Sequence, residues 1–430
     1  MSIRHTPSAA RRGRLPWACL GLLLAGLACG PSSSPCEPAQ RLPCECRDGS
    51  VGSQVCGSDG TPQACACSVD AGTGGGSGDG GTTDPAGGVA GFDAWLGPQV
   101  APLIDVTGAA GKATAVVVGV STPALRHVFG HGMTKVGGAA PGGTTLFEIG
   151  SVTKVYTGVL LGRSVGAGDL ALGDLINPYF PLGAPSRNGT SISLLDLATH
   201  SSGLPDFDPG YVSGVPMSPG ANYGEEDLAA CMAGGCPLAF TPGARAQYSN
   251  LGSGTLGHIL RKRAQRPTYL ALVSQEILAP LQLTDTTVVL SAEQQSRMAQ
   301  GYANGSPAPP IQIGEPLAGA GALRSTALDV LRFLESSFDA STPALAAAWQ
   351  LALEPRRPAG PNMMIGLQVA VETTNGKTVC SKGGNTPGFS SYVFITPSQR
   401  AAVVVLANSG GLNLKPLGLA VLDRLHAPAP

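Results

Sequence analysis

The stretch FEIGSVTKVYTG, residues 147–158, places a serine and a lysine three positions apart at the head of an apolar run. Apolar residues recur there at the spacing of one helix face, which predicts a buried helix; they are Val152, Val155, Tyr156, Val159 and Leu160. Residues three apart on a helix are neighbours, so Lys154 is expected beside the Ser151 hydroxyl. Burial and the positive end of the helix both disfavour a protonated lysine. The stretch predicts a serine nucleophile with a lysine base, and the alternative is a serine N-cap followed by a solvated lysine.

Two later stretches carry further groups suited to acyl transfer. In FTPGARAQYSNLGSGTLGHIL, residues 240–260, Tyr248 and Asn250 can point the same way from a loop that precedes a helix. In CSKGGNTPGFSSY, residues 380–392, Lys382 precedes two glycines that leave a strand edge open to a substrate backbone. The alternatives are an ordinary polar loop and a glycine turn with an unrelated lysine.

The three stretches occur in the order S-x-x-K, Y-x-N and K-G-G, which resembles the signature of the serine β-lactamase and penicillin-binding protein superfamily. LLDLATHSSGLPDF at 194–207 and AGALRSTALDVLRFL at 320–334 are similar to segments of its class C-like branch. The resemblance covers roughly residues 92–425. It implies an α/β (α+β) fold, in which helices flank an antiparallel sheet and an all-α lobe completes the site.

The resemblance also implies catalytic roles. Ser151 would attack an amide or ester carbonyl and become acylated, with Lys154 helping to remove its proton. Tyr248 would transfer a proton to the leaving group and activate the deacylating water. Lys382 would contact a substrate carboxylate or orient Tyr248. His200, in the family-like loop, is expected to be structural.

Other residues would bind the substrate. Asn250, Gly383 and Gly384 are the expected substrate-binding residues, and the backbone N–H groups of Ser151 and Asn385 would form the oxyanion hole. Many β-lactam-hydrolysing relatives have K-T-G at the third motif. Gly383 provides no hydroxyl, so a group that often helps to bind a β-lactam carboxylate is missing here.

The apolar pattern along the main domain predicts its layout. A helix at 92–106 precedes a strand hairpin, and further strands and a closing helix end the chain; the expected ranges are 113–120, 125–132, 366–373, 377–384, 389–397 and 401–409 for strands and 415–425 for the helix. Asn375-Gly376 is a strong hairpin turn signal. Strands from both ends are expected to form one sheet, with terminal helices on one face and a cleft against a helical lobe.

The N-terminal region reads as an export signal. Arginines precede an apolar stretch from Leu15 to Ala28, too short to span a membrane, so residues 1–28 are predicted to be a signal peptide. Cys29 lies where a lipoprotein is lipidated. The expected product is a lipid-anchored protein facing the periplasm or cell surface, and ordinary secretion is the alternative.

The remaining divisions follow from composition. Residues 29–67 are a Cys-rich segment, residues 68–90 a Gly/Ser/Asp-rich linker, and residues 91–430 the hydrolase domain. The clustered cysteines predict up to three disulfides of unassigned pairing, with a zinc site as the weaker alternative; they are Cys36, Cys44, Cys46, Cys56, Cys65 and Cys67. Cys231 and Cys236 could close a small loop, and Cys380 has no obvious partner.

Charge and motifs together indicate which partners and which activity to expect. Nucleic-acid binding usually requires a basic face, and a formal net charge of −1 gives no indication of one. No metal or cofactor is expected. The expected partner is a small molecule or a peptidoglycan-type peptide. The prediction is thus a serine hydrolase acting on a D-alanyl peptide, a small ester or a β-lactam, and the alternative is a peptidoglycan-binding or sensor protein with little turnover.

Overall fold

The computed structural model describes residues 41–45, 51–55, 88–209, 222–374 and 377–426. The chain divides into two units, Met1–Gly81 and Thr82–Pro430. In the first, strands β1 (Arg41–Glu45) and β2 (Val51–Val55) pair antiparallel. The expected signal peptide, Cys29 and the pairing of the clustered cysteines lie outside the described residues. Among the described helices, none combines the length and apolar character needed to cross a bilayer.

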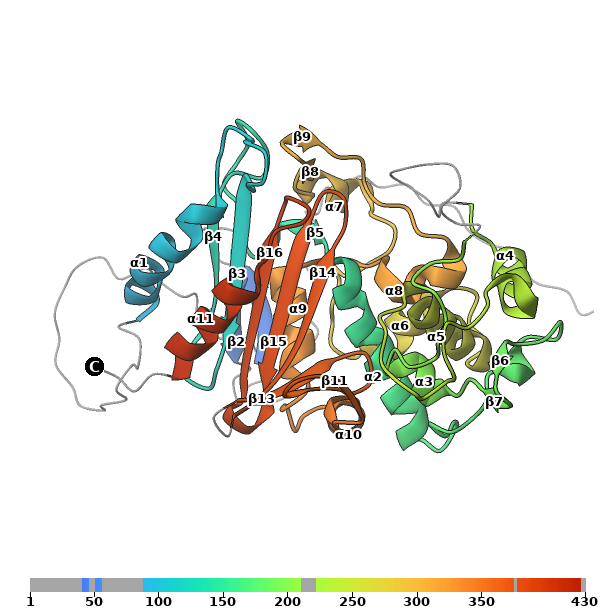
Figure 1. Cartoon of the computed structure of the whole chain (residues 1–430). Coiled ribbons are helices and arrows are strands. Elements are labelled where there is room, and N and C mark those ends of the chain that lie inside the picture. The colour runs from blue at the N-terminus through green and yellow to red at the C-terminus, as the bar shows by residue number, and fades with distance from the viewer. Residues whose placement is uncertain (1–40, 46–50, 56–87, 210–221, 375–376, 427–430) are drawn as a thin grey trace, which may run out of the picture. The chain divides into compact units, whose positions relative to one another are not determined.

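The second unit is built on an eight-stranded antiparallel sheet (Figure 1). Its strands, in spatial order, are β11 (Arg357–Gly360), β12 (Met363–Ile365), β13 (Ala370–Thr374), β14 (Lys377–Asn385), β15 (Ser390–Thr396), β16 (Ala401–Ala407), β3 (Ala115–Ser121) and β4 (Arg126–Gly132). Pairing of β16 with β3 joins the two ends of the unit. The predicted antiparallel sheet made from both ends is therefore confirmed.

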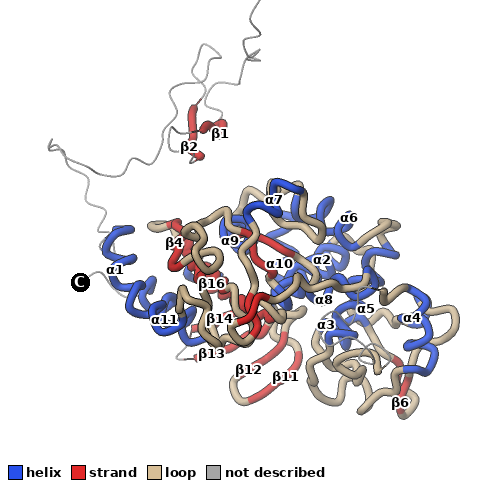
Figure 2. The backbone as a smooth tube through the Cα atoms, turned by 90° about the horizontal axis from the view of Figure 1, so that it is seen from above, coloured by secondary structure: helices blue, strands red, loops and turns tan. Residues whose placement is uncertain are grey.

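Helices cover both faces of this sheet (Figures 1 and 2). Helices α1 (Gly88–Val100) and α11 (Lys415–His426) pack with Val116, Val118 and Val120 of β3 on one face. On the other face, Val117 packs in the core that includes α2 (Thr153–Gly166) and α9 (Ala327–Glu335). Because β3 is buried on both faces, its sequence is a continuous apolar run rather than an alternating one.

The helical lobe lies beyond α2, on the side of the sheet away from α1 (Figure 1). Its helices are α3 (Leu194–Ala198), α4 (Glu225–Ala230), α5 (Asn250–Arg263), α6 (Tyr269–Val273) and α8 (Ala318–Gly321), with α10 (Pro343–Leu353) against α2. The short strand pairs are β5 (Leu146–Glu148) with β10 (Arg324–Thr326), β6 (Ser186–Arg187) with β7 (Thr190–Ser191), and β8 (Tyr302–Ala303) with β9 (Ser306–Pro307). Helix α7 (Ala292–Arg297) lies apart from the lobe, near β5 and β8 (Figure 1).

The structure corrects two expected boundaries and adds two strands. The strand expected at 366–373 begins only at Ala370, because the amides of Leu367 and Gln368 donate to carbonyls outside the sheet, and Gln368 has a φ of 67°. The helix expected at 92–106 ends at Val100 and continues as a short 3₁₀ turn. The sheet also has two strands, β11 and β12, that were not predicted. The turn at 375–376 lies outside the described residues.

Candidate active site

A tight turn brings Ser151 against strand β14. Ser151 lies in a 3₁₀ turn, Gly150–Val152, directly before α2. Gly150 has a φ of 46°, and a Cβ there would lie 2.8 Å from the carbonyl oxygen of Asn385. A Cβ on Gly384 would lie 2.2 Å from the carbonyl oxygen of Ile149 and 3.0 Å from the Ser151 amide nitrogen. The two glycines therefore allow β14 to pack directly on the turn that carries Ser151.

Helix α2 carries Lys154 into the interior. The helix is buried on all sides for most of its length rather than on one face, and Lys154 is fully buried. Lys154 Nζ lies 3.0 Å from Ser151 Oγ. It also donates to Asn250 Oδ1 and to the carbonyl oxygen of Ala320, both at 2.6 Å. The predicted proximity of the lysine to the hydroxyl is thus present.

This environment favours an uncharged lysine. Burial holds the pKa of Lys154 well below its usual range; the charge of Lys382 lowers it further, and Asp206 opposes both effects. A neutral amine has two hydrogens and one lone pair. Because Asn250 and Ala320 accept the two hydrogens, the lone pair is left for the Ser151 hydroxyl. The geometry therefore suits proton transfer from Ser151 to Lys154.

Tyr248 completes the contacts of Ser151. Its Oη lies 2.6 Å from Ser151 Oγ. The centroid of its ring lies 5.0 Å from Lys154 Nζ and 4.9 Å from Lys382 Nζ. Burial raises the pKa of Tyr248, an effect that the hydrogen bond to Ser151 opposes and the charge of Asp206 reinforces. Burial lowers the pKa of Lys382 to about 8. A protonated phenol between two lysines can donate a proton and remain close to positive charge.

The loop 200–206 holds the Tyr248 segment in place. The carbonyl of His200 accepts from the amide of Gln247 at 2.7 Å, and its Nδ1 accepts from the amide of Ser249 at 3.4 Å. The rings of His200 and Tyr248 are 4.6 Å apart. Burial, followed by the charges of Lys382 and Lys154, holds the pKa of His200 well below its usual range. His200 is therefore a neutral hydrogen-bond acceptor behind the tyrosine.

Asp206 orients the side chain of Asn250. Asp206 Oδ1 accepts from the backbone amide of Asn250 at 3.0 Å and from its Nδ2 at 2.8 Å. The carboxylate thereby directs the amide oxygen of Asn250 towards Lys154. Asp206 was not predicted to be a site residue, although it lies within the family-like segment at 194–207. No local spacing pairs it with a residue 44 positions later.

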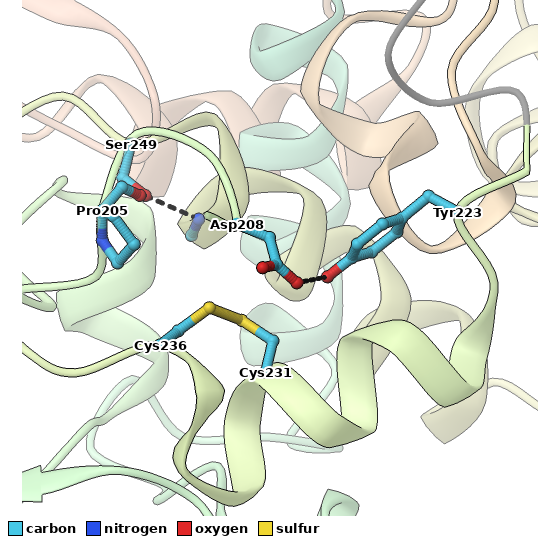
Figure 3. Close-up of a disulfide and its surroundings, with 7 residues drawn as sticks. Pro205, Asp208, Tyr223, Cys231, Cys236 and Ser249 are labelled. Atoms are coloured by element: carbon cyan, nitrogen blue, oxygen red, sulfur yellow. Dashed lines mark hydrogen bonds between the residues drawn. A yellow bond between two sulfur atoms is a disulfide. The ribbon is translucent and has the colours of Figure 1, made fainter. Parts of the chain in front are cut away.

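A disulfide lies beside this loop (Figure 3). Cys231 and Cys236 are joined, as the spacing allowed. Nearby, Asp208 accepts from Tyr223 Oη (Figure 3). The carbonyl oxygen of Pro205 accepts from Ser249 Oγ at 2.7 Å. Asp208 and the two cysteines lie within metal-ligand reach of one another, but the joined sulfurs are not thiolates that could bind a metal.

The glycine-rich end of β14 has an open edge. Pairing of β14 with β13 ends at Ser381, so residues 382–385 pair only with β15 within the described sheet. Gly383 and Asn385 line the adjacent cavity. Cys380 is buried and unpaired, and burial raises the pKa of its thiol to about 12, so it is not a reactive group of the site.

The cavity beside Ser151 has a volume of about 440 Å³ and lies where sheet and helical lobe meet, as predicted. It is lined by Gly150, Ser151, Phe207, Tyr248, Asn250, Ile311, Ile313, Leu317, Ala320, Gly321, Gly383, Asn385 and Thr386. Of the predicted site residues, the cavity lining includes Ser151, Tyr248, Asn250, Gly383 and Asn385. Lys154 and Lys382 are not part of the lining but lie against the Tyr248 ring, and Gly384, predicted to bind substrate, packs on the turn of Ser151 instead. The apolar wall of the cavity at 311–317 was not predicted.

Known proteins are similar to this chain in sequence and in fold. The family model described as Beta-lactamase matches residues 100–427. A beta-lactamase of Yersinia enterocolitica is 26% identical over 347 residues, covering 71% of this chain and 84% of that protein. The D-alanyl-D-alanine-carboxypeptidase/endopeptidase AmpH of Escherichia coli (strain K12) is 32% identical over 235 residues, covering 53% of this chain and 57% of AmpH.

Solved structures agree at the level of fold. A beta-lactamase/D-alanine carboxypeptidase from Pseudomonas syringae superposes with a TM-score of 0.65 at 23% identity, covering 77% of this chain and 99% of that one. A class C beta-lactamase gives a TM-score of 0.67 at 19% identity, covering 78% of this chain and 98% of that one. Because the family model matches well over half of the sequence, the chain belongs to the beta-lactamase family.

Proposed function

We propose that the protein is an exported serine hydrolase that acts through an acyl-enzyme on Ser151. The observation that carries this proposal is the convergence on Ser151 Oγ of Lys154 Nζ at 3.0 Å and Tyr248 Oη at 2.6 Å. The substrate is an amide or ester, and the family includes enzymes named for β-lactams and for D-alanyl-D-alanine peptides.

In the first half-reaction, Ser151 Oγ attacks the carbonyl carbon while its proton passes to the lone pair of Lys154. The carbonyl oxygen becomes negative and is stabilised by the backbone N–H groups of Ser151 and Asn385. The bond to the leaving group then breaks, and the leaving group takes a proton from Tyr248. The phenolate recovers a proton from Lys154, which restores both groups.

In the second half-reaction, water attacks the acyl-serine ester. The neutral Lys154 takes the proton of that water through Tyr248, which accepts it while passing its own phenolic proton to Lys154. The bond from the acyl carbon to Oγ then breaks, and Oγ takes the proton back from Lys154. The products are a carboxylic acid and the protonated leaving group. Lys382 keeps positive charge beside Tyr248, which stabilises a transient phenolate.

Export and anchoring are part of the proposal. The signal-like residues 1–28 and the cysteine cluster support it, and so does the Cys231–Cys236 disulfide, since disulfides persist mainly outside the cytosol. Lipidation of Cys29 would hold the enzyme at a membrane, within reach of peptidoglycan-type peptides.

A substrate panel tests the function. We expect the wild type to hydrolyse at least one of a D-alanyl-D-alanine peptide, nitrocefin and p-nitrophenyl acetate, and the Ser151→Ala variant to lose that activity. Stoichiometric acylation without product release would instead identify a binding or sensor protein. Equal turnover by the wild type and Ser151→Ala would exclude the mechanism.

A further inference from the structure

One wall of the cavity beside Ser151 is apolar and fixed in place. Ile311, Ile313 and Leu317 line it, together with the partly exposed ring of Phe207. None of the described lining residues is an aspartate, glutamate, lysine or arginine. A cavity of this composition favours a neutral, apolar substituent over a charged one, because burying an unpaired charge is costly.

A buried ion pair holds this wall. Glu148 of β5 is 1% exposed, and its Oε1 accepts from the backbone amide of Ile311 at 2.7 Å. Arg324 of β10 donates to the carbonyl oxygen of Ile311 at 2.7 Å and lies 3.5 Å from Glu148. Both backbone polar groups of Ile311 are therefore satisfied by side chains from the strand pair behind it. The wall is preformed, so little ordering is needed when a substrate binds.

Gly321 lies between the wall residue Ile313 and the turn that carries Ser151. A Cβ on Gly321 would lie 3.3 Å from Ile313 Cδ1 and 3.8 Å from the carbonyl oxygen of Gly150. Gly321 therefore keeps open the space between Ile313 and the turn that carries Ser151. In an acyl-enzyme, the acyl group is covalently attached to Oγ and must occupy space continuous with it.

We propose that the wall of Ile311, Ile313 and Leu317 is an acyl subsite that selects esters or amides whose acyl group is an uncharged alkyl chain. This inference rests on the proposed function and specifies its substrate. Each methylene that moves from water to this wall raises kcat/KM about fourfold until the cavity is filled.

The test is a chain-length series with a constant leaving group: p-nitrophenyl acetate, butyrate and hexanoate. We expect kcat/KM to rise about 10²-fold from acetate to hexanoate. Ethyl and hexyl acetate, which lengthen the leaving group instead, should differ little. A flat or falling acyl series, or a gain that follows the leaving group, would overturn the proposal.

Two variants test whether this wall is where the acyl chain binds. Ile313→Asn should lower the hexanoate-to-acetate ratio at least tenfold. The matched control is Val289→Asn: Val289 is 73% exposed and lines a neighbouring hollow on which Ile311 and Ile313 also border. Val289→Asn should leave the ratio unchanged, and a loss there equal to that of Ile313→Asn would show that the chain binds in the outer hollow and refute the subsite.

Active-site titration distinguishes a failure of the acyl subsite from a failure of the proposed hydrolase function. Labelling with diethyl p-nitrophenyl phosphate counts the folded, reactive sites in each preparation, so that poor folding of a variant is not read as lost specificity. If wild-type Ser151 is labelled but the acyl series is flat, the subsite is wrong and the hydrolase proposal stands. If no ester is cleaved and Ser151 is not labelled, the proposed function itself fails.

Discussion

Replacing Gly384 by alanine should damage catalysis without unfolding the protein. The added Cβ would lie 2.2 Å from the carbonyl oxygen of Ile149 and 2.4 Å from Ser391 Oγ, whereas ordinary contacts begin at 3.4 Å. The backbone beside Ser151 must therefore shift by roughly 1 Å, a misplacement that can lower the rate about 10²-fold. Overpacking of this kind also lowers the free energy of unfolding by about 1–3 kcal/mol.

The assay is kcat/KM for p-nitrophenyl acetate, together with urea unfolding. Gly97→Ala is the matched control, because a Cβ on Gly97 in helix α1 meets nothing within 4 Å. The control should keep full activity. Unchanged kcat/KM and unchanged stability in Gly384→Ala would refute the close packing of β14 on the turn of Ser151.

Three further predictions concern the groups around the site. Asp206→Ala should lower kcat about tenfold with little change in KM, because the amide that contacts Lys154 loses its charged hydrogen-bond partner; steady-state kinetics measures the split, and an effect on KM alone would count against it. Burial lowers the pKa of Lys382 to about 8, so its charge is lost as the pH rises through 8. The KM of a peptide with a free carboxylate should then rise about tenfold per pH unit, while that of a neutral ester should not; parallel profiles from pH 6.5 to 9.5 would disprove a contact between Lys382 and the carboxylate. Replacing Cys231 and Cys236 by serine should lower the free energy of unfolding by about 2 kcal/mol, measured in urea, and an unchanged value would show that the loop is held by its other contacts.

Local patterns in the sequence predicted most of what places the nucleophile. The spacing of Ser151 and Lys154 within one helical turn requires their proximity, and the structure places their side-chain atoms 3.0 Å apart. The apolar run of β3 and that of β16 each predicted a buried strand. The pairing of the two, from opposite ends of the unit, follows because both must be covered on two faces.

Long-range contacts could not be predicted in the same way. Asp206 acts on Asn250 through a contact that no periodicity encodes. The wall at Ile311 is set by Glu148, which precedes it by 163 positions. Gln368 interrupts the expected strand because its amide donates to Ala198 in the helical lobe, so tertiary structure outweighs a strong local strand pattern.

Covalent labelling of Ser151 tests the central claim most directly. After incubation with a reactive phosphonate ester, peptide mass spectrometry should find one adduct per chain, on Ser151. Lys154→Met should react at least about 10²-fold more slowly, because the base is lost. A folded wild-type protein that carries no adduct, or carries it on another residue, would contradict the account.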